Sequence, residues 1–182
     1  MRLNLLVAGL VFAQSAQATV VLKLNRAQMT NMSSVVIHAR VGKINVAEER
    51  PGALSTLIEL EVLSSYKGKL QAGRVITLMQ VGGQKGDLIQ SIPGTSEFRI
   101  GEELVLFLSA FANRYVQVGV GLGRFVVSRN GGEVIVAEEF GDVSFASPGK
   151  DGVIRPGPSP LPARLKLSEL AREIRGFVRL AP

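Results

Sequence analysis

Residues 104–108, Leu-Val-Leu-Phe-Leu, constrain the fold more than any other part of this sequence. Successive side chains of a strand point to opposite faces of a sheet, so an uninterrupted apolar run places apolar side chains on both faces. A strand of this kind is buried on both sides. It lies within residues 93–127, which continue through a turn at residues 112–114 into an alternating segment and a glycine-spaced one. These residues predict the core of a small, mainly β protein.

Alternating apolar residues predict further strands before this run, at residues 35–46, 56–66 and 74–81. In the first of them the alternation slips by one position after Gly42, which indicates a β-bulge. A bulge bends a strand, as the closing of a barrel requires. We therefore expect residues 19–146 to form a small closed or partly open β-barrel.

Three local signals add detail to this scheme. Asn25 is a candidate N-cap for a brief helix over residues 25–33, and Asn130-Gly131 predicts a type I′ hairpin turn. The glycines of residues 118–123 superficially resemble a nucleotide-binding loop, but a strand rather than a helix is expected after them. We expect these glycines to permit a close strand crossing or a sharp bend.

The C-terminal part has a different composition. Residues 147–163 contain five prolines and predict an extended tether, with a docking segment as the alternative. Residues 164–182 predict an amphipathic helix with Ser168 as candidate N-cap. Its apolar positions are Leu167, Leu170, Ala171, Ile174, Phe177 and Val178. We expect this stripe to pack on the barrel; a membrane surface and a partner's groove are the alternatives.

The N-terminus has the organisation of a secretory signal peptide. Arg2 supplies a positive charge, residues 5–13 are apolar, and residues 16–18 form a small-x-small cleavage motif. A membrane anchor needs about 20 apolar residues, and polar residues interrupt this run. We expect residues 1–18 to be removed and the mature chain to begin at Thr19, without a transmembrane span. The protein is then periplasmic or secreted.

Composition and charge narrow the classes of function. The 182 residues include no cysteine, which excludes a disulfide scaffold and thiol catalysis. The net charge is +6, and removal of Arg2 with the signal leaves 20 basic and 15 acidic residues, or +5. Such a surplus favours anionic partners, here an anionic envelope component. With eight Phe, two Tyr and no Trp to stack on bases, we expect no nucleic-acid partner.

The single histidine, His38, lies on the face of its predicted strand opposite Ile37 and Ala39. The chain has no second His and no Cys, so the usual ligands of a zinc site are missing around His38. No nucleophile-elbow motif supplies a serine that His38 could activate. We expect a surface or rim histidine.

The carboxylates are grouped without forming a known catalytic or metal-binding pattern. Glu102 and Glu103 are adjacent, so in a strand they point to opposite faces and cannot converge on one bond. A second group has oxygen ligands suited to calcium but lacks EF-hand spacing, which favours a solvated acidic patch. Its members are Glu138, Glu139, Asp142 and Asp151. We expect no catalytic residue, no cofactor and no metal site.

Residues 82–93 form a polar, glycine-bearing segment between predicted strands. Segments of this kind on a rigid scaffold often carry function. The candidate partner-binding residues are Gly82, Gly83, Lys85 and Asp87.

An ordered set of segments carries a resemblance to a known family. The segments are residues 34–41, 60–68, 81–83, 101–108 and 118–125, with Pro93 and Phe98. Together they resemble a family of small exported bacterial proteins that is generally left without an assigned activity. The layout is also similar to the netrin-like fold of the tissue inhibitors of metalloproteinases, a five-stranded OB barrel with helices. Those inhibitors chelate a protease's zinc through an N-terminal cysteine, whereas this mature chain would begin at Thr19, so no functional residue is carried over.

The sequence thus predicts an exported, non-catalytic β-barrel domain that binds another exported protein or an anionic envelope component. A protease inhibitor is the sharpest form of this hypothesis, and the resemblance alone implies it. The alternative is a calcium-binding protein or carboxylate-dependent enzyme of the cell envelope that uses Asp87, Glu102 or the acidic group near residue 138.

Overall fold

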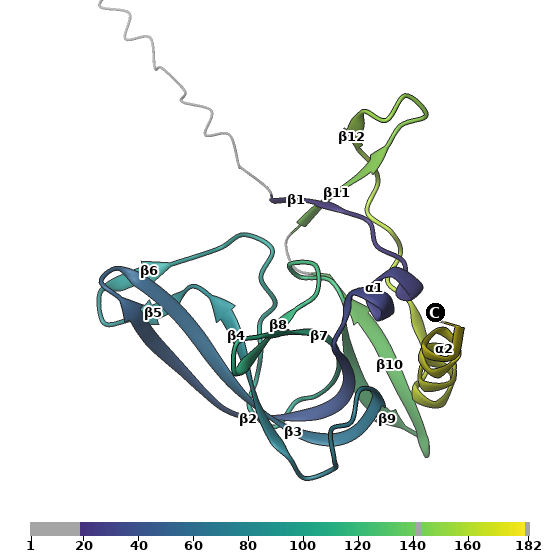
Figure 1. The fold of residues 1–182 in the computed structure, drawn as a ribbon, viewed down its shortest axis with the longest axis horizontal. Helices are drawn as coiled ribbons and strands as arrows, with labels where there is room; N and C mark the ends of the chain where they lie inside the picture. The colour runs from purple at the N-terminus through teal and green to yellow at the C-terminus, as the bar shows by residue number, and fades with distance from the viewer. Residues whose placement is uncertain (1–18, 141–142, 181–182) are drawn as a thin grey trace, which may run out of the picture.

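The structure is a computed structural model that describes residues 19–140 and 143–180. The expected signal peptide and Asp142 lie outside the described residues. The chain is mainly β, with a short helix near Thr19 and a longer one at the C-terminal end (Figure 1). The strands are β1 (Thr19–Leu22), β2 (Val35–Arg50), β3 (Ala53–Lys67), β4 (Val75–Val81), β5 (Gly83–Lys85), β6 (Leu88–Gln90), β7 (Glu103–Phe111), β8 (Arg114–Gln117), β9 (Arg124–Asn130), β10 (Glu133–Glu139), β11 (Val143–Pro148), β12 (Ile154–Pro156) and β13 (Arg164–Lys166). The helices are α1 (Arg26–Met32) and α2 (Leu167–Leu180).

The largest sheet has the strand order β13-β10-β9-β7-β2-β3-β4-β8, and β7 also pairs with β8. The second pairing joins β7, β2, β3, β4 and β8 into a ring, which β9, β10 and β13 extend beyond β7. The ring closes between β4 and β8 through a single parallel pair, Leu78 with Tyr115. Within the described ranges no helix is both long and apolar enough to cross a membrane.

The central strand β7 is buried on both faces, as its sequence predicts. Leu104, Leu106 and Leu108 point into the ring, where they contribute to a core shared with β2, β3 and β4. Val105 and Phe107 point outward into a second core shared with β9, β10, α1 and α2. All five side chains are fully buried. The two cores therefore lie on opposite faces of β7.

The predicted bulge in the first long strand is confirmed. Val41 pairs with Leu60 and Ile44 with Ile58, so two residues of β2, one of them Gly42, stand opposite one residue of β3. Three further register shifts occur between these strands. Irregularities of this kind increase twist and bend a strand, and β2 and β3 curve strongly around the ring (Figure 1).

Local side-chain and glycine preferences explain the start of α1 and the β9–β10 turn, although this turn is one residue away from its expected position. The Asn25 side chain accepts a hydrogen bond from the Gln28 amide (2.8 Å) while the Gln28 side chain accepts one from the Asn25 amide (2.9 Å), a capping box that begins α1. The β9–β10 turn is Gly131-Gly132, with φ of 57° and 85°, rather than Asn130-Gly131. Asn130 instead pairs with Glu133. Glycine adopts positive φ without a steric penalty, so Gly131 and Gly132 can occupy both central positions of this turn.

Helix α2 packs its apolar side on the outer face of the large sheet. Leu170, Ala171 and Ile174 are buried in the same core as Tyr66 and Phe125. The helix begins at Leu167, so Ser168 lies in its first turn rather than at its N-cap. Strand β13 ends at the preceding residue, which leaves no separate capping turn between the two elements.

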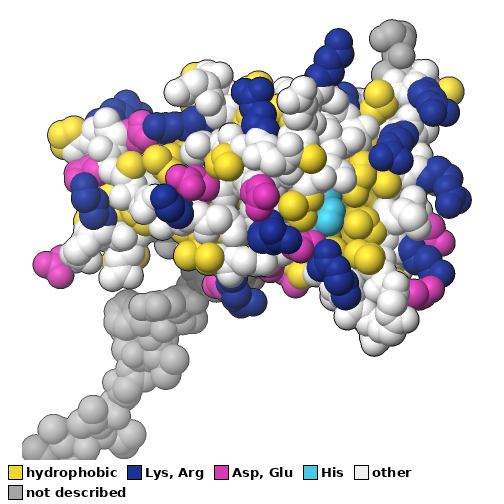
Figure 2. All heavy atoms as spheres, turned by 90° about the horizontal axis from the view of Figure 1, so that it is seen from below, with side chains coloured by type: hydrophobic (Ala, Val, Ile, Leu, Met, Phe, Trp, Pro, Cys, Tyr) yellow, Lys and Arg dark blue, Asp and Glu magenta, His cyan; other side chains and the backbone are white. Residues whose placement is uncertain are grey.

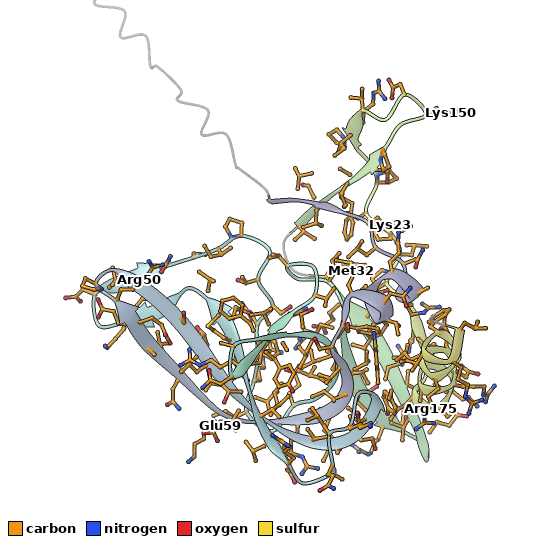
Figure 3. All side chains as sticks on the ribbon, in the orientation of Figure 1. Lys23, Met32, Arg50, Glu59, Lys150 and Arg175 are labelled. Atoms are coloured by element: carbon orange, nitrogen blue, oxygen red, sulfur yellow. The ribbon has the colours of Figure 1, made fainter. Side chains whose placement is uncertain are left out.

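The proline-rich segment contributes to a third sheet, with strand order β1-β11-β12, whose β12 end projects from the rest of the molecule (Figure 1). Pro148 pairs with Ile154 and Pro156 with Ala146, and Lys150 lies in the loop between the two strands (Figure 3). A proline lacks the N–H of a sheet ladder, which is tolerated at the end of β11 and in the edge strand β12. Part of the expected tether is therefore a hairpin.

Candidate functional site

The predicted partner-binding segment forms a β-hairpin. Strands β5 and β6 pair as Gly83 with Gln90, Gln84 with Ile89, and Lys85 with Leu88. Gly86 (φ 60°) is the first of the two residues that connect them. A glycine at the first central position is typical of the type II′ turns that match the twist of paired strands.

The base of the hairpin is held against β2 and β3 by close contacts. The Gly82 amide donates to the Leu54 carbonyl (2.9 Å), the Thr56 hydroxyl donates to the Gly82 carbonyl (2.8 Å), and the Leu54 amide donates to Gln90 Oε1 (2.8 Å). A Cβ on Gly82 would lie 2.6 Å from the Gln90 carbonyl oxygen, and one on Gly83 2.8 Å from Thr56 Oγ1. Two of the four predicted site residues, Gly82 and Gly83, therefore position the hairpin.

The tip presents the other two predicted residues together with two that sequence reasoning missed. Lys85 and Asp87 are exposed, with Lys85 Nζ 3.6 Å from Glu48 Oε2. Leu88 and Ile89 are 40% and 66% exposed. Because Leu88 is beside Lys85 and Ile89 beside Gln84, the two apolar side chains lie on opposite faces of the hairpin. Two adjacent apolar residues in a polar segment were the signal that could have found them.

Replacement of Gly83 by alanine should destabilise the fold by about 1–3 kcal/mol, because its φ of 143° and its close neighbours both resist a side chain. Urea unfolding measures the change. Gly42→Ala is the matched control: its Cβ would meet its nearest neighbour at an ordinary 3.5 Å. Equal stability of the two variants would contradict a fixed hairpin base.

His38 is buried, not on the surface or rim as its sequence context suggested. It lies on the predicted face of β2, with Nε2 3.1 Å from Glu103 Oε2. Arg40 (3.0 Å) and Arg129 (2.7 Å) donate to the same carboxylate. The hydrogen bond from Arg129 is the main cause that lowers the pKa of Glu103 to about 2, and burial lowers the pKa of His38. Tertiary packing brings these strands together, which a single-strand pattern does not show.

Glu102 and Glu103 enter separate ion pairs, as their alternation predicts. Glu102 accepts from Arg124 Nη2 (2.6 Å), and Arg124 also donates to Glu139. The Arg124 side chain is buried and lies over the Phe98 ring, 5.6 Å from its centroid. Glu102 and Glu103 are thus both paired with arginine side chains of the protein itself.

The expected acidic patch is divided in the structure. Glu139 pairs with Arg124, and Asp151 pairs with Arg155 (2.6 Å). Glu138 is half-buried and accepts a hydrogen bond from the Ala163 amide, and burial raises its pKa. Across residues 19–140 and 143–180, no three His, Cys, Asp or Glu side chains are grouped so as to hold a metal ion.

The glycine-spaced segment forms a tight loop between β8 and β9. Gly119, Gly121 and Gly123 all have positive φ, and a Cβ on Gly123 would lie 3.1 Å from Phe107 Cβ. Strand β9 follows directly, so the segment makes the sharp bend expected of it. Comparison of the chain with protein-family models, curated proteins and solved structures gives no match.

Proposed function

We propose that the chain is an exported, non-catalytic domain with an OB-like β-barrel that binds another exported protein through the β5–β6 hairpin. The observation that carries the proposal is the exposure of Leu88 and Ile89 on a hairpin whose base is held by Gly82 and Gly83. The five-strand ring with its curved, bulged β2 supports the OB-like assignment.

The hairpin has the physical properties of a binding element. Interface energy concentrates in a few apolar anchors surrounded by polar groups that exclude water. Here Leu88 and Ile89, one on each face of the hairpin, are paired with the polar residues Lys85 and Gln84. An anchor on a fixed hairpin loses little conformational freedom when it binds. Protease inhibition is one form of this function; its support is the resemblance of the layout to the netrin-like inhibitors, with the hairpin rather than a cysteine as the contact.

The ionisable clusters favour a structural role over catalysis. Glu103 is held by two arginines and His38, and Glu102 by Arg124. A general acid or base needs a pKa near the working pH, whereas the pKa of Glu103 is about 2.

The double variant Leu88→Ser/Ile89→Ser tests the proposal. The wild-type protein is used to capture its partner from the exported fraction, and the purified partner is then titrated calorimetrically against each variant. We expect the double variant to bind at least about tenfold more weakly, because both apolar anchors are lost.

The matched control is Val153→Ser/Ile154→Ser, since these side chains are similarly exposed (53% and 56%) at the start of β12, away from β5 and β6 (Figure 1). The control should bind like the wild type. Undiminished binding by the hairpin variant, or an equal loss in the control, would exclude the hairpin as the contact.

A further inference from the structure

The outer face of α2 carries three arginines in one stripe. Arg172, Arg175 and Arg179 are exposed and spaced i, i+3 and i+7. At 3.6 residues per turn they lie within about 60° of one another around the helix and span about 10 Å along it. Leu170 and Ile174, on the other side of the helix, are buried in the core. Arg175 lies at the outer margin of the molecule (Figure 3).

The positive charge of this stripe is not neutralised by the part of the chain that the structure describes. None of the three arginines is in an ion pair there; the Arg175 guanidinium lies over the Tyr66 ring, 5.4 Å from its centroid. The acidic residues of α2 have other partners: Glu173 pairs with Arg26 (2.8 Å) and Glu169 accepts from the Lys166 amide (3.1 Å).

Helix stability does not account for the stripe. A cation in the last turn interacts favourably with the helix dipole, but this effect ends within one turn. Only Arg179 lies in the last turn of α2. Arg172 and Arg175 precede it and, in the described structure, have no anionic partner. Figure 2 shows that, on the face in view, the charged side chains at the end of the molecule containing α2 are predominantly Lys and Arg.

We propose that the arginine stripe of α2 docks on a bilayer surface rich in anionic phospholipids. Guanidinium groups form paired hydrogen bonds with phosphate oxygens, and basic clusters are drawn to anionic leaflets. Leu180, which follows Arg179 at the end of α2 and is 83% exposed, can enter the apolar layer beneath the head groups. A soluble polyanion has no such layer. The apolar side of α2 is occupied by the protein core, so the contact is mainly electrostatic.

The location of the stripe leaves the hairpin free. Helix α2 and the β5–β6 hairpin lie on opposite sides of the molecule (Figure 1). A bilayer on one side and a protein partner on the other can therefore be bound together, and the docking does not rest on the identity of that partner.

Sedimentation with vesicles tests the docking, using protein purified from exporting cells. We expect binding to vesicles of equal parts phosphatidylglycerol and phosphatidylcholine, none to phosphatidylcholine alone, and loss of binding in about 0.5 M NaCl. The variant Arg172→Gln/Arg175→Gln/Arg179→Gln should bind about 100-fold more weakly, since each basic residue contributes about fivefold. Its thermal melting, followed by circular dichroism, should match the wild type within a few degrees.

Lys43→Gln/Lys69→Gln/Arg74→Gln is the matched control, because it removes the same net charge from exposed residues outside α2. It should retain most of the affinity. Leu180→Ser should weaken vesicle binding and leave binding to inorganic polyphosphate unchanged. The proposal fails if the wild type does not bind the anionic vesicles, if both triple variants lose affinity equally, or if Leu180→Ser leaves vesicle binding unchanged.

Discussion

Replacement of Phe107 by alanine should lower the free energy of unfolding by about 3–5 kcal/mol. Phe107 is fully buried in β7, and its ring lies 6.0 Å from that of Phe125, centroid to centroid. It also contacts the backbone bend at Gly123. Removal of the ring opens a cavity between β7, β9 and α1 that these elements cannot close without shifting the sheet.

Urea unfolding followed by far-ultraviolet circular dichroism measures this change. Phe111→Ala is the control on the same strand, because its side chain is 56% exposed, and it should change stability by less than about 1 kcal/mol. A loss in Phe107→Ala no larger than in the control would show that the outer core does not depend on this ring.

Replacement of Glu103 by glutamine should destabilise the protein at neutral pH by up to about 3 kcal/mol. The variant leaves Arg40 and Arg129 without the carboxylate that they share, next to the buried His38. The magnitude follows from the fall of the pKa of Glu103 from 4.5 to about 2 on folding. It is an upper bound, because both arginines are about half exposed and water screens their charges.

The pH dependence of this difference has a definite sign. A carboxylate whose pKa is depressed in the folded state contributes its full stability above its unfolded value of 4.5 and loses it as the pH falls to about 2. The stability of the wild type should therefore converge on that of Glu103→Gln between these pH values. Urea unfolding at a series of pH values measures the difference, with the exposed Glu97→Gln as control. A difference that persists unchanged near pH 2 would show that shape rather than charge is responsible.

Local patterns predicted much of the secondary structure and the location of the candidate site. The run at residues 104–108 predicted a doubly buried strand, the slip after Gly42 predicted a bulge, and Asn25 predicted the start of α1. Each depends on neighbours within a few residues of the chain. The segment with Lys85 and Asp87 was likewise singled out, and it forms an exposed hairpin.

Long-range packing decided the points on which the predictions failed. His38 was expected near the surface, but its burial depends on β7 and β9, which place Glu103 and Arg129 around it. The pairing of β1 with β11 joins segments more than a hundred residues apart, and it draws part of the proline-rich segment into a sheet. Neither the burial of His38 nor the pairing of β1 with β11 produces a periodic pattern in the sequence from which it could be predicted.

The sequence by itself determined that this protein is mainly β, with a two-sided central strand and an amphipathic C-terminal helix, because side-chain alternation and helical spacing are properties of neighbouring residues. Only the tertiary structure decided which of its charged and apolar side chains are exposed and free to contact a partner. Glu102 and Glu103 are taken up by arginines from other strands, whereas Leu88, Ile89 and the α2 arginines stay exposed. Whether a side chain is paired or exposed depends on which distant segments pack beside it in the folded chain. The residues next to it in the sequence do not show this.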